Sequence, residues 1–212
     1  LDLVNGVAAD HGRPGLDALL ALSRRTDLSV EQVERLAELA GAHPLATGGQ
    51  RLLALDMRIK AYPEKARELM DQALEKARGG TPEDRRSLGV WFNNRKEYER
   101  ALKAIPIDEA SMRKDLLLVH LDALAALKRW DEVAAILKRK DAPLDEVYRE
   151  LFLARSAMER GDRGVSDVHW RRAHLAIGVS TDHAWYVASY AERLGRMDQA
   201  EIAYRGLTSK AT

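Results

Sequence analysis

The sequence predicts an all-α protein, a right-handed α–α superhelix (solenoid) of five to six helical hairpins. Pairs of a small and a bulky residue, four positions apart, recur about every 32 to 35 residues, the period of a helical-hairpin array. The pairs are Ala66/Met70, Ala101/Ile105, Val133/Leu137, Ser166/Trp170 and Ala200/Tyr204. Helix-period hydrophobic patterning runs almost end to end, and β-branched runs are too short for strands. Connections of only a few residues require paired helices to lie antiparallel and adjacent.

Six helical hairpins are expected along the chain, and each is delimited by turn or cap signals. The expected helix pairs are 16–24 with 30–40, 50–61 with 64–77, 82–94 with 97–105, 109–127 with 131–140, 145–160 with 164–177, and 182–194 with 197–207. We expect one helical-repeat domain over residues 1–212, with repeats at about 13–46, 47–80, 81–113, 114–146, 147–180 and 181–212.

Particular residues mark where these helices begin and end. Ser29 with Gln32 forms a capping-box pattern before the second helix. Thr81 followed by Pro82 supplies an N-cap and a first-turn proline. Gly161 and Gly195 mark turns inside the fifth and sixth hairpins.

Composition narrows the class of function. The net charge is +1, from 34 Lys and Arg against 33 Asp and Glu, so no global field favours nucleic acid or an anionic membrane. No stretch is apolar for long enough to suggest membrane insertion. The absence of cysteine excludes disulfides and thiolate chemistry and leaves a cytoplasmic or a periplasmic location open. The start at Leu1 and the apolar set Leu3, Val4 and Val7, which reads as the tail of an earlier helix, suggest a piece of a longer protein.

One stretch carries a family resemblance. Leu88-Gly89-Val90-Trp91-Phe92 followed by Tyr98-Glu99-Arg100-Ala101 resembles a tetratricopeptide repeat over one full unit. Related sets of residues extend the resemblance over roughly residues 49–207. The resemblance implies that first helices line a concave groove and that the protein is a scaffold for other proteins rather than an enzyme. A HEAT-like array is disfavoured because its period is longer, about 40 to 47 residues.

No pattern predicts catalysis, a metal or another cofactor. His169 and His174 are five residues apart and therefore do not share a helix face. No nucleophile elbow and no phosphate-binding loop with its lysine is present. The basic clusters 138–140 and 171–172 are typical of solvated helix faces.

A partner-binding groove is expected on the first helices. Helical spacing places its residues as Arg51, Leu55, Arg58, Arg86, Val90, Asn93, Leu118, Asp122, Arg155, Met158, Trp185, Ser189 and Glu192. Arginines suit carboxylates, so the strip predicts a protein or peptide partner carrying an acidic segment. The alternative is a glycan- or substrate-handling module of a cell-envelope polysaccharide-processing or export system, which concave aromatic residues would favour.

Overall fold

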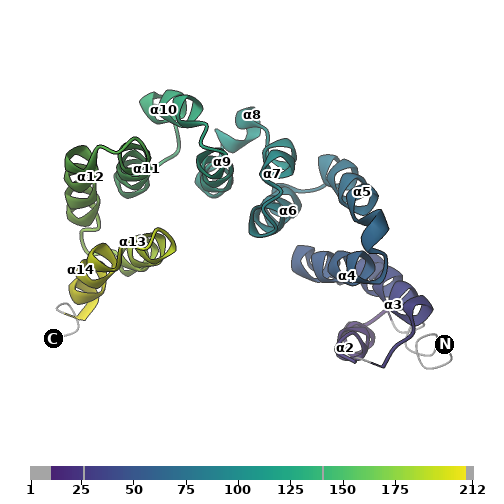
Figure 1. The fold of residues 1–212 in the computed structure, drawn as a ribbon. Coiled ribbons are helices and arrows are strands. Elements are labelled where there is room, and N and C mark those ends of the chain that lie inside the picture. The colour runs from purple at the N-terminus through teal and green to yellow at the C-terminus, as the bar shows by residue number, and fades with distance from the viewer. Residues whose placement is uncertain (1–10, 26, 140, 209–212) are drawn as a thin grey trace. The chain divides into compact units, whose positions relative to one another are not determined.

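The protein is helical throughout the part that the computed structural model describes, residues 11–25, 27–139 and 141–208 (Figure 1). No strand occurs within these residues, which confirms the predicted all-α class. Internal contacts divide the chain into two compact units, Leu1–Ile107 (unit 1) and Asp108–Thr212 (unit 2). The set Leu3, Val4 and Val7 and the end of the last predicted repeat lie outside the described residues.

The described part of unit 1 contains six α-helices and one short 3₁₀ helix. They are α2 (Arg13–Leu22), α3 (Val30–Ala42), α4 (Gly48–Ala61), η1 (Pro63–Lys65), α5 (Ala66–Arg78), α6 (Pro82–Asn94) and α7 (Tyr98–Ala104). Leu19, Leu36 and Met57 belong to one buried cluster that joins α2, α3 and α4. Helices α6 and α7 pack closely on each other.

Unit 2 continues with paired helices. After α8 (Ile107–Ala110), which spans the boundary, come α9 (Lys114–Ala126), α10 (Trp130–Lys138), α11 (Glu146–Glu159), α12 (Arg163–Ala176), α13 (Thr181–Arg193) and α14 (Met197–Thr208). The main core lies between α11, α12, α13 and α14, with Leu151, Trp170 and Tyr190 almost fully buried. Burying each side chain of this kind contributes roughly 1.5–3 kcal/mol, and only a neighbouring helix can cover it.

The predicted helix starts are confirmed. The Gln32 backbone N–H donates to the Ser29 hydroxyl, and the Ser29 N–H donates back to the Gln32 side chain, so the capping box is complete. Thr81 caps α6 in the same reciprocal way with Asp84, and Pro82 occupies the first turn. A third box, formed by Thr47 and Gln50, begins α4. These caps satisfy backbone donors that would otherwise have no partner.

One turn geometry recurs inside four hairpins. A residue in the left-handed region ends the first helix at Lys96, Lys128, Gly161 and Gly195, with φ of 63°, 59°, 80° and 69°. The N–H of the next residue donates to the carbonyl five residues earlier, at 2.9–3.0 Å in each case. This is the hydrogen-bond pattern of a Schellman motif, and it recurs about every 33 residues.

The small residue of each pair follows this turn at a fixed distance. Five positions beyond the left-handed residue lie Ala101, Val133, Ser166 and Ala200, with at most 3% of the residue exposed. The Ser166 hydroxyl also donates to the Ala154 carbonyl across the hairpin. In each of these four hairpins, the turn thus places a compact, buried residue at the same position of the returning helix.

Two elements differ from the sequence prediction. The helix expected over 109–127 is interrupted, because Arg113 adopts an extended backbone (φ −141°, ψ 131°) before α9 begins. Its guanidinium forms a bidentate pair with Asp115 in the first turn of α9. The second difference is at Ala66, the small residue of the first predicted pair, which stays partly exposed because η1 follows the turn at Tyr62 and Pro63.

The recurring turn predicts opposite effects for two substitutions. A Cβ added at Gly195 meets no atom within 4 Å, so Gly195→Ala should destabilise the protein only through its left-handed backbone, by about 1 kcal/mol. Lys128→Gly removes the same strain and should stabilise by about 0.5 kcal/mol after the entropy cost of glycine. Urea unfolding measures the change in the free energy of unfolding for both variants. A change of the same sign in both would contradict the turn assignment.

The close helix crossing predicts overpacking at Ala101. Ala101→Leu should lower the free energy of unfolding by about 1–3 kcal/mol, because Ala101 is 1% exposed between α6 and α7. Ala135→Leu on the exposed face of α10 is the matched control and should change stability little. Unchanged thermal stability of Ala101→Leu would mean that the crossing has room to spare.

Candidate functional site

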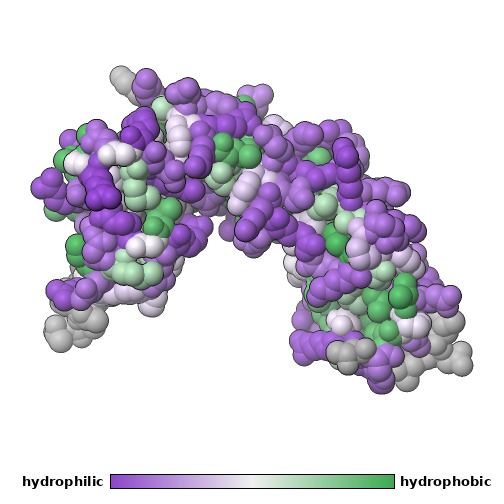
Figure 2. Space-filling view, in the orientation of Figure 1, coloured by the Kyte–Doolittle hydropathy of each residue, from purple (hydrophilic) through white to green (hydrophobic). Residues whose placement is uncertain are grey.

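A cavity of about 850 Å³ lies within unit 1 and is walled by α3, α4, α5 and the start of α6. Much of its wall consists of alanine and glycine, such as Ala37, Gly41, Ala54, Ala73 and Ala77. Leucines from α4, α5 and α6 complete the apolar part. Figure 2 shows hydrophobic side chains at the surface over α3 and α4. The volume falls in the range of sites that bind ligands or side chains of a partner.

The cavity occurs where the hairpin geometry changes. In three of the hairpins with a left-handed turn residue, α6–α7, α11–α12 and α13–α14, the second helix packs extensively on the first, whereas α9 and α10 pack less closely. Between α4 and α5, the chain instead passes through Tyr62, which has φ −132° and ψ 72°, and through η1. Helix α4 then packs more extensively on α3 than on α5. Because the nearby side chains are small, the space that this leaves is not filled.

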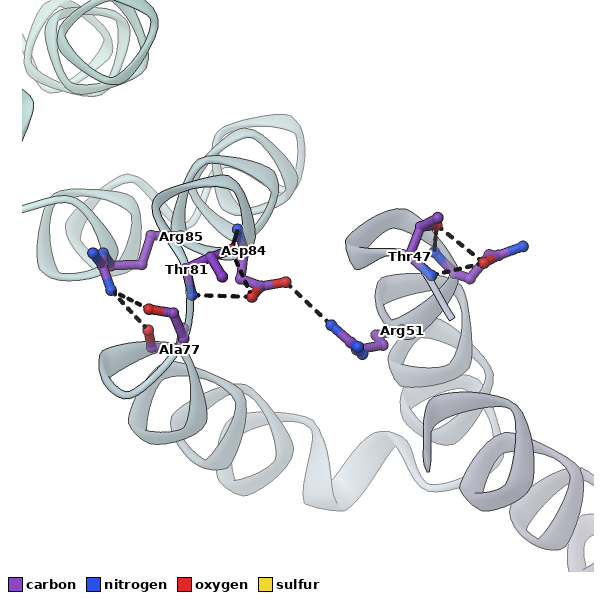
Figure 3. A network of polar contacts seen from close by, with 8 residues as sticks. Thr47, Arg51, Ala77, Thr81, Asp84 and Arg85 are labelled. Carbon is purple, nitrogen blue, oxygen red and sulfur yellow. Dashed lines mark hydrogen bonds and ion pairs between the residues drawn. The ribbon is translucent and has the colours of Figure 1, made fainter. Parts of the chain in front are cut away.

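A network of helix caps holds the walls in place (Figure 3). Thr81 donates to Asp84 Oδ2 from its backbone N–H at 3.1 Å and from its hydroxyl at 2.9 Å. Arg85 donates to the Gly80 carbonyl at 2.8 Å, at the end of α5. Arg51 reaches from α4 toward Asp84 on α6, and its Nη1 lies 3.2 Å from Oδ1. One carboxylate thus caps α6 and also joins α6 to α4.

The electrostatics of Asp84 keep this junction charged. Hydrogen bonds from the Thr81 backbone and hydroxyl, and then the charge of Arg51, lower the pKa of Asp84 below its ordinary value. Asp84 therefore stays ionised throughout the physiological pH range. Arg51 is held by a permanent counter-ion rather than by a group that titrates.

The remaining charges around the cavity are also mostly paired. Arg58 Nη2 lies 2.9 Å from Glu34 Oε1, and both side chains are half-buried. Glu38 lies 3.3 Å from Arg35 on the same helix. Lys76 on α5 is exposed at the cavity, and within the described residues no hydrogen bond or ion pair holds its ammonium.

Three of the residues expected from sequence line this cavity. They are Arg51, Leu55 and Arg58, all on α4. Arg86, Val90 and Asn93 lie on α6, outside the residues that line the cavity.

In unit 2, another face brings groove residues together. Asp122 on α9 lies 3.7 Å from Arg193 on α13. The Arg155 guanidinium lies 5.6 Å from the centre of the Trp130 ring. The buried hydroxyls of Tyr186 and Tyr190 have no hydrogen-bond partner within the described part of the chain, and burial raises the pKa of both phenols.

The rest of the expected strip lies elsewhere in unit 2. Leu118 and Met158 are partly buried on α9 and α11. Trp185 packs edge-on against Tyr204 of α14, with ring centres 5.3 Å apart, and Glu192 accepts a hydrogen bond from the same tyrosine. Ser189 is exposed on the same helix. Arg193, which lies near Asp122, shares one face of α13 with Tyr186 and Tyr190. Each of these three residues comes one position after an expected groove residue, namely Trp185, Ser189 or Glu192.

Sequence reasoning missed the contribution of α5 to the cavity. Gln72, Ala73 and Lys76 belong to a second helix, which the repeat logic assigns to the outer layer. The usable signal was Pro63 at the turn, since it breaks the pattern of the other hairpins. A second signal for the contribution of α5 was the pair of small residues Ala73 and Ala77, which are four positions apart and close to Gly79 and Gly80.

Two histidines in unit 2 each form a hydrogen bond with one side chain of another helix. His169 Nδ1 lies 2.7 Å from Glu150 Oε2, and His174 Nε2 lies 3.0 Å from Gln199 Oε1. No group of three or more metal-ligating side chains occurs among the residues described. Within the same part of the chain, no helix combines the length and apolar character needed to cross a bilayer.

Comparison of the chain with protein-family models, with curated proteins and with solved structures found no match. The functional argument therefore depends on the geometry of the two units.

The site in unit 2 predicts a pH-dependent effect of Asp122. Removal from water raises the pKa of this carboxyl, and the charges of Arg193 and Arg155 oppose the rise only in part. The unfolded state therefore ionises first as pH rises, and stability is lost between the unfolded pKa, about 4, and the higher folded pKa. Asp122→Asn should be more stable than the wild type near pH 7, and this gain should vanish below about pH 4.

Thermal unfolding across this pH range is the measurement. Asp131→Asn, at an exposed position on α10, is the control. A variant that is less stable at neutral pH would show that the ion pair with Arg193 outweighs the cost of burial.

Proposed function

We propose that the chain is a tetratricopeptide-like helical-repeat module that binds a segment of a protein partner and performs no catalysis. The main support is the cavity of about 850 Å³ in unit 1, which is apolar, half-open and framed by paired charges. Such a site suits one or more bulky side chains of a peptide, since each buried aliphatic chain contributes roughly 1.5–3 kcal/mol.

The recurring turn supports the repeat part of this proposal. Four hairpins share a left-handed residue, the same backbone hydrogen bond and a buried compact residue five positions later. An array of this kind forms a superhelical solenoid that presents its first helices to partners. That class of architecture, together with the cavity, supports a protein-binding role.

The glycan alternative has less support in the cavity itself. Among the described residues that line it there is no tryptophan, tyrosine or phenylalanine, whereas sugar rings are commonly held against aromatic faces. In unit 2, Tyr148 is only 8% exposed and Tyr186 is partly buried, whereas Trp185 is 53% exposed and is the aromatic residue of the expected strip that a sugar ring could reach.

Filling the cavity tests the proposal. Peptides are selected from a random phage-displayed library on the immobilised wild-type chain, and their affinities are then measured for two tryptophan variants. Ala73→Trp places an indole in the cavity and should weaken selected peptides by at least about tenfold, or about 1.4 kcal/mol. Ala135→Trp, on an exposed helix face in unit 2, should leave them unchanged.

Circular dichroism first establishes that both variants keep the helical content of the wild type. A library that yields no enriched peptide, or peptides that bind Ala73→Trp as tightly as wild type, would refute binding in this cavity.

A further inference from the structure

The charges at the cavity differ in whether they are available to a ligand. Arg51 is held by Asp84 at 3.2 Å and Arg58 by Glu34 at 2.9 Å, so both arginines have a counter-ion within the chain. A ligand carboxylate that took either arginine would leave a partly buried acid without its partner. Because an unpaired, partly buried charge is costly, these arginines serve as fixed walls of the site.

Lys76 is in a different position. It stands on α5 at the cavity and is exposed, and the described part of the chain supplies no acid within ion-pair distance of its ammonium. Its acidic neighbours on the helix bond elsewhere, Asp71 to Arg100 and Glu75 to Arg78. Glu38 and Asp84, the two acids that line the cavity, are likewise paired.

We propose that the partner segment carries a carboxylate beside its bulky aliphatic side chain and that Lys76 receives this carboxylate. The inference rests on the proposed function and adds the chemistry of the partner: an acidic, aliphatic peptide. The aliphatic group enters the space beside Ala73, and the carboxylate stays at the rim. The methylene stem of a lysine can lie along an apolar wall while its ammonium remains near water.

The location of the charge supports this choice of ligand. At the edge of an apolar wall, water screens a charge pair less than on an open surface, so one ammonium suffices to select an acid over an amide. A basic residue at the same place in the peptide would be repelled by Lys76.

A charge-reversal cycle tests the inference with synthetic peptides from the library selection. In enriched peptides, Asp or Glu should stand next to Leu, Ile or Met. Replacing that acid by its amide should weaken binding to the wild type about tenfold, but less than about twofold for Lys76→Met. Lys76→Glu should bind the acidic peptide more weakly still and recover binding when the peptide acid is replaced by lysine.

Lys103→Glu is the matched control, because Lys103 is exposed on α7 and does not line the cavity. It should leave every affinity unchanged. The difference between Lys103→Glu and Lys76→Glu should shrink as salt rises from about 0.05 to 0.5 M, since screening weakens the contact.

The outcomes separate this inference from the proposed function. Peptides that are blocked by Ala73→Trp but are neutral, or are insensitive to Lys76→Glu, would overturn the role of Lys76 and leave peptide binding in the cavity intact. A selection without enriched peptides would overturn both.

Discussion

The structure depends on one local constraint, the left-handed turn that ends the first helix of a hairpin. At Lys96, Lys128, Gly161 and Gly195, the next N–H bonds back to a carbonyl five residues earlier, and this fixes the direction in which the chain returns. A returning helix with so little freedom must pack directly on the first. The requirement for a compact residue five positions later, and for a bulky residue four beyond it, follows from that distance.

The cavity lies at the hairpin α4–α5, where the left-handed turn is replaced by another connection. Between α4 and α5, Pro63 has no N–H to donate and the chain forms η1 instead of the tight turn. Ala66 stays partly exposed, and the small residues Ala73 and Ala77 of α5 line the cavity. The same alanine and glycine content that would allow close packing in a regular hairpin here leaves an opening of useful size.

Most helix ends could be predicted from the sequence, but the charge pairs of the site could not. Helix ends depend on neighbouring residues, whereas the charge pairs join residues far apart in the sequence. Helix ends follow from local chemistry, so the cap at Ser29 and the start at Pro82 were predictable to the residue. The break before α9 was not, because no proline or glycine marks Arg113. On α4, helical spacing selected Arg51, Leu55 and Arg58. It could not reveal that Asp84 and Glu34 already neutralise the two arginines, since these pairs join residues 33 and 24 positions apart.

Pairing, rather than the number of charges, decides what a surface can bind. In unit 2, Asp122 of α9 lies 3.7 Å from Arg193 of α13, and the hydroxyls of Tyr186 and Tyr190 are buried. These two charges therefore partner each other within the chain. In unit 1, an apolar opening adjoins the Lys76 ammonium, which has no counter-ion among the described residues. A ligand could cover the opening by burial and neutralise the charge. Binding is therefore best sought at the irregular hairpin, where these two properties occur side by side.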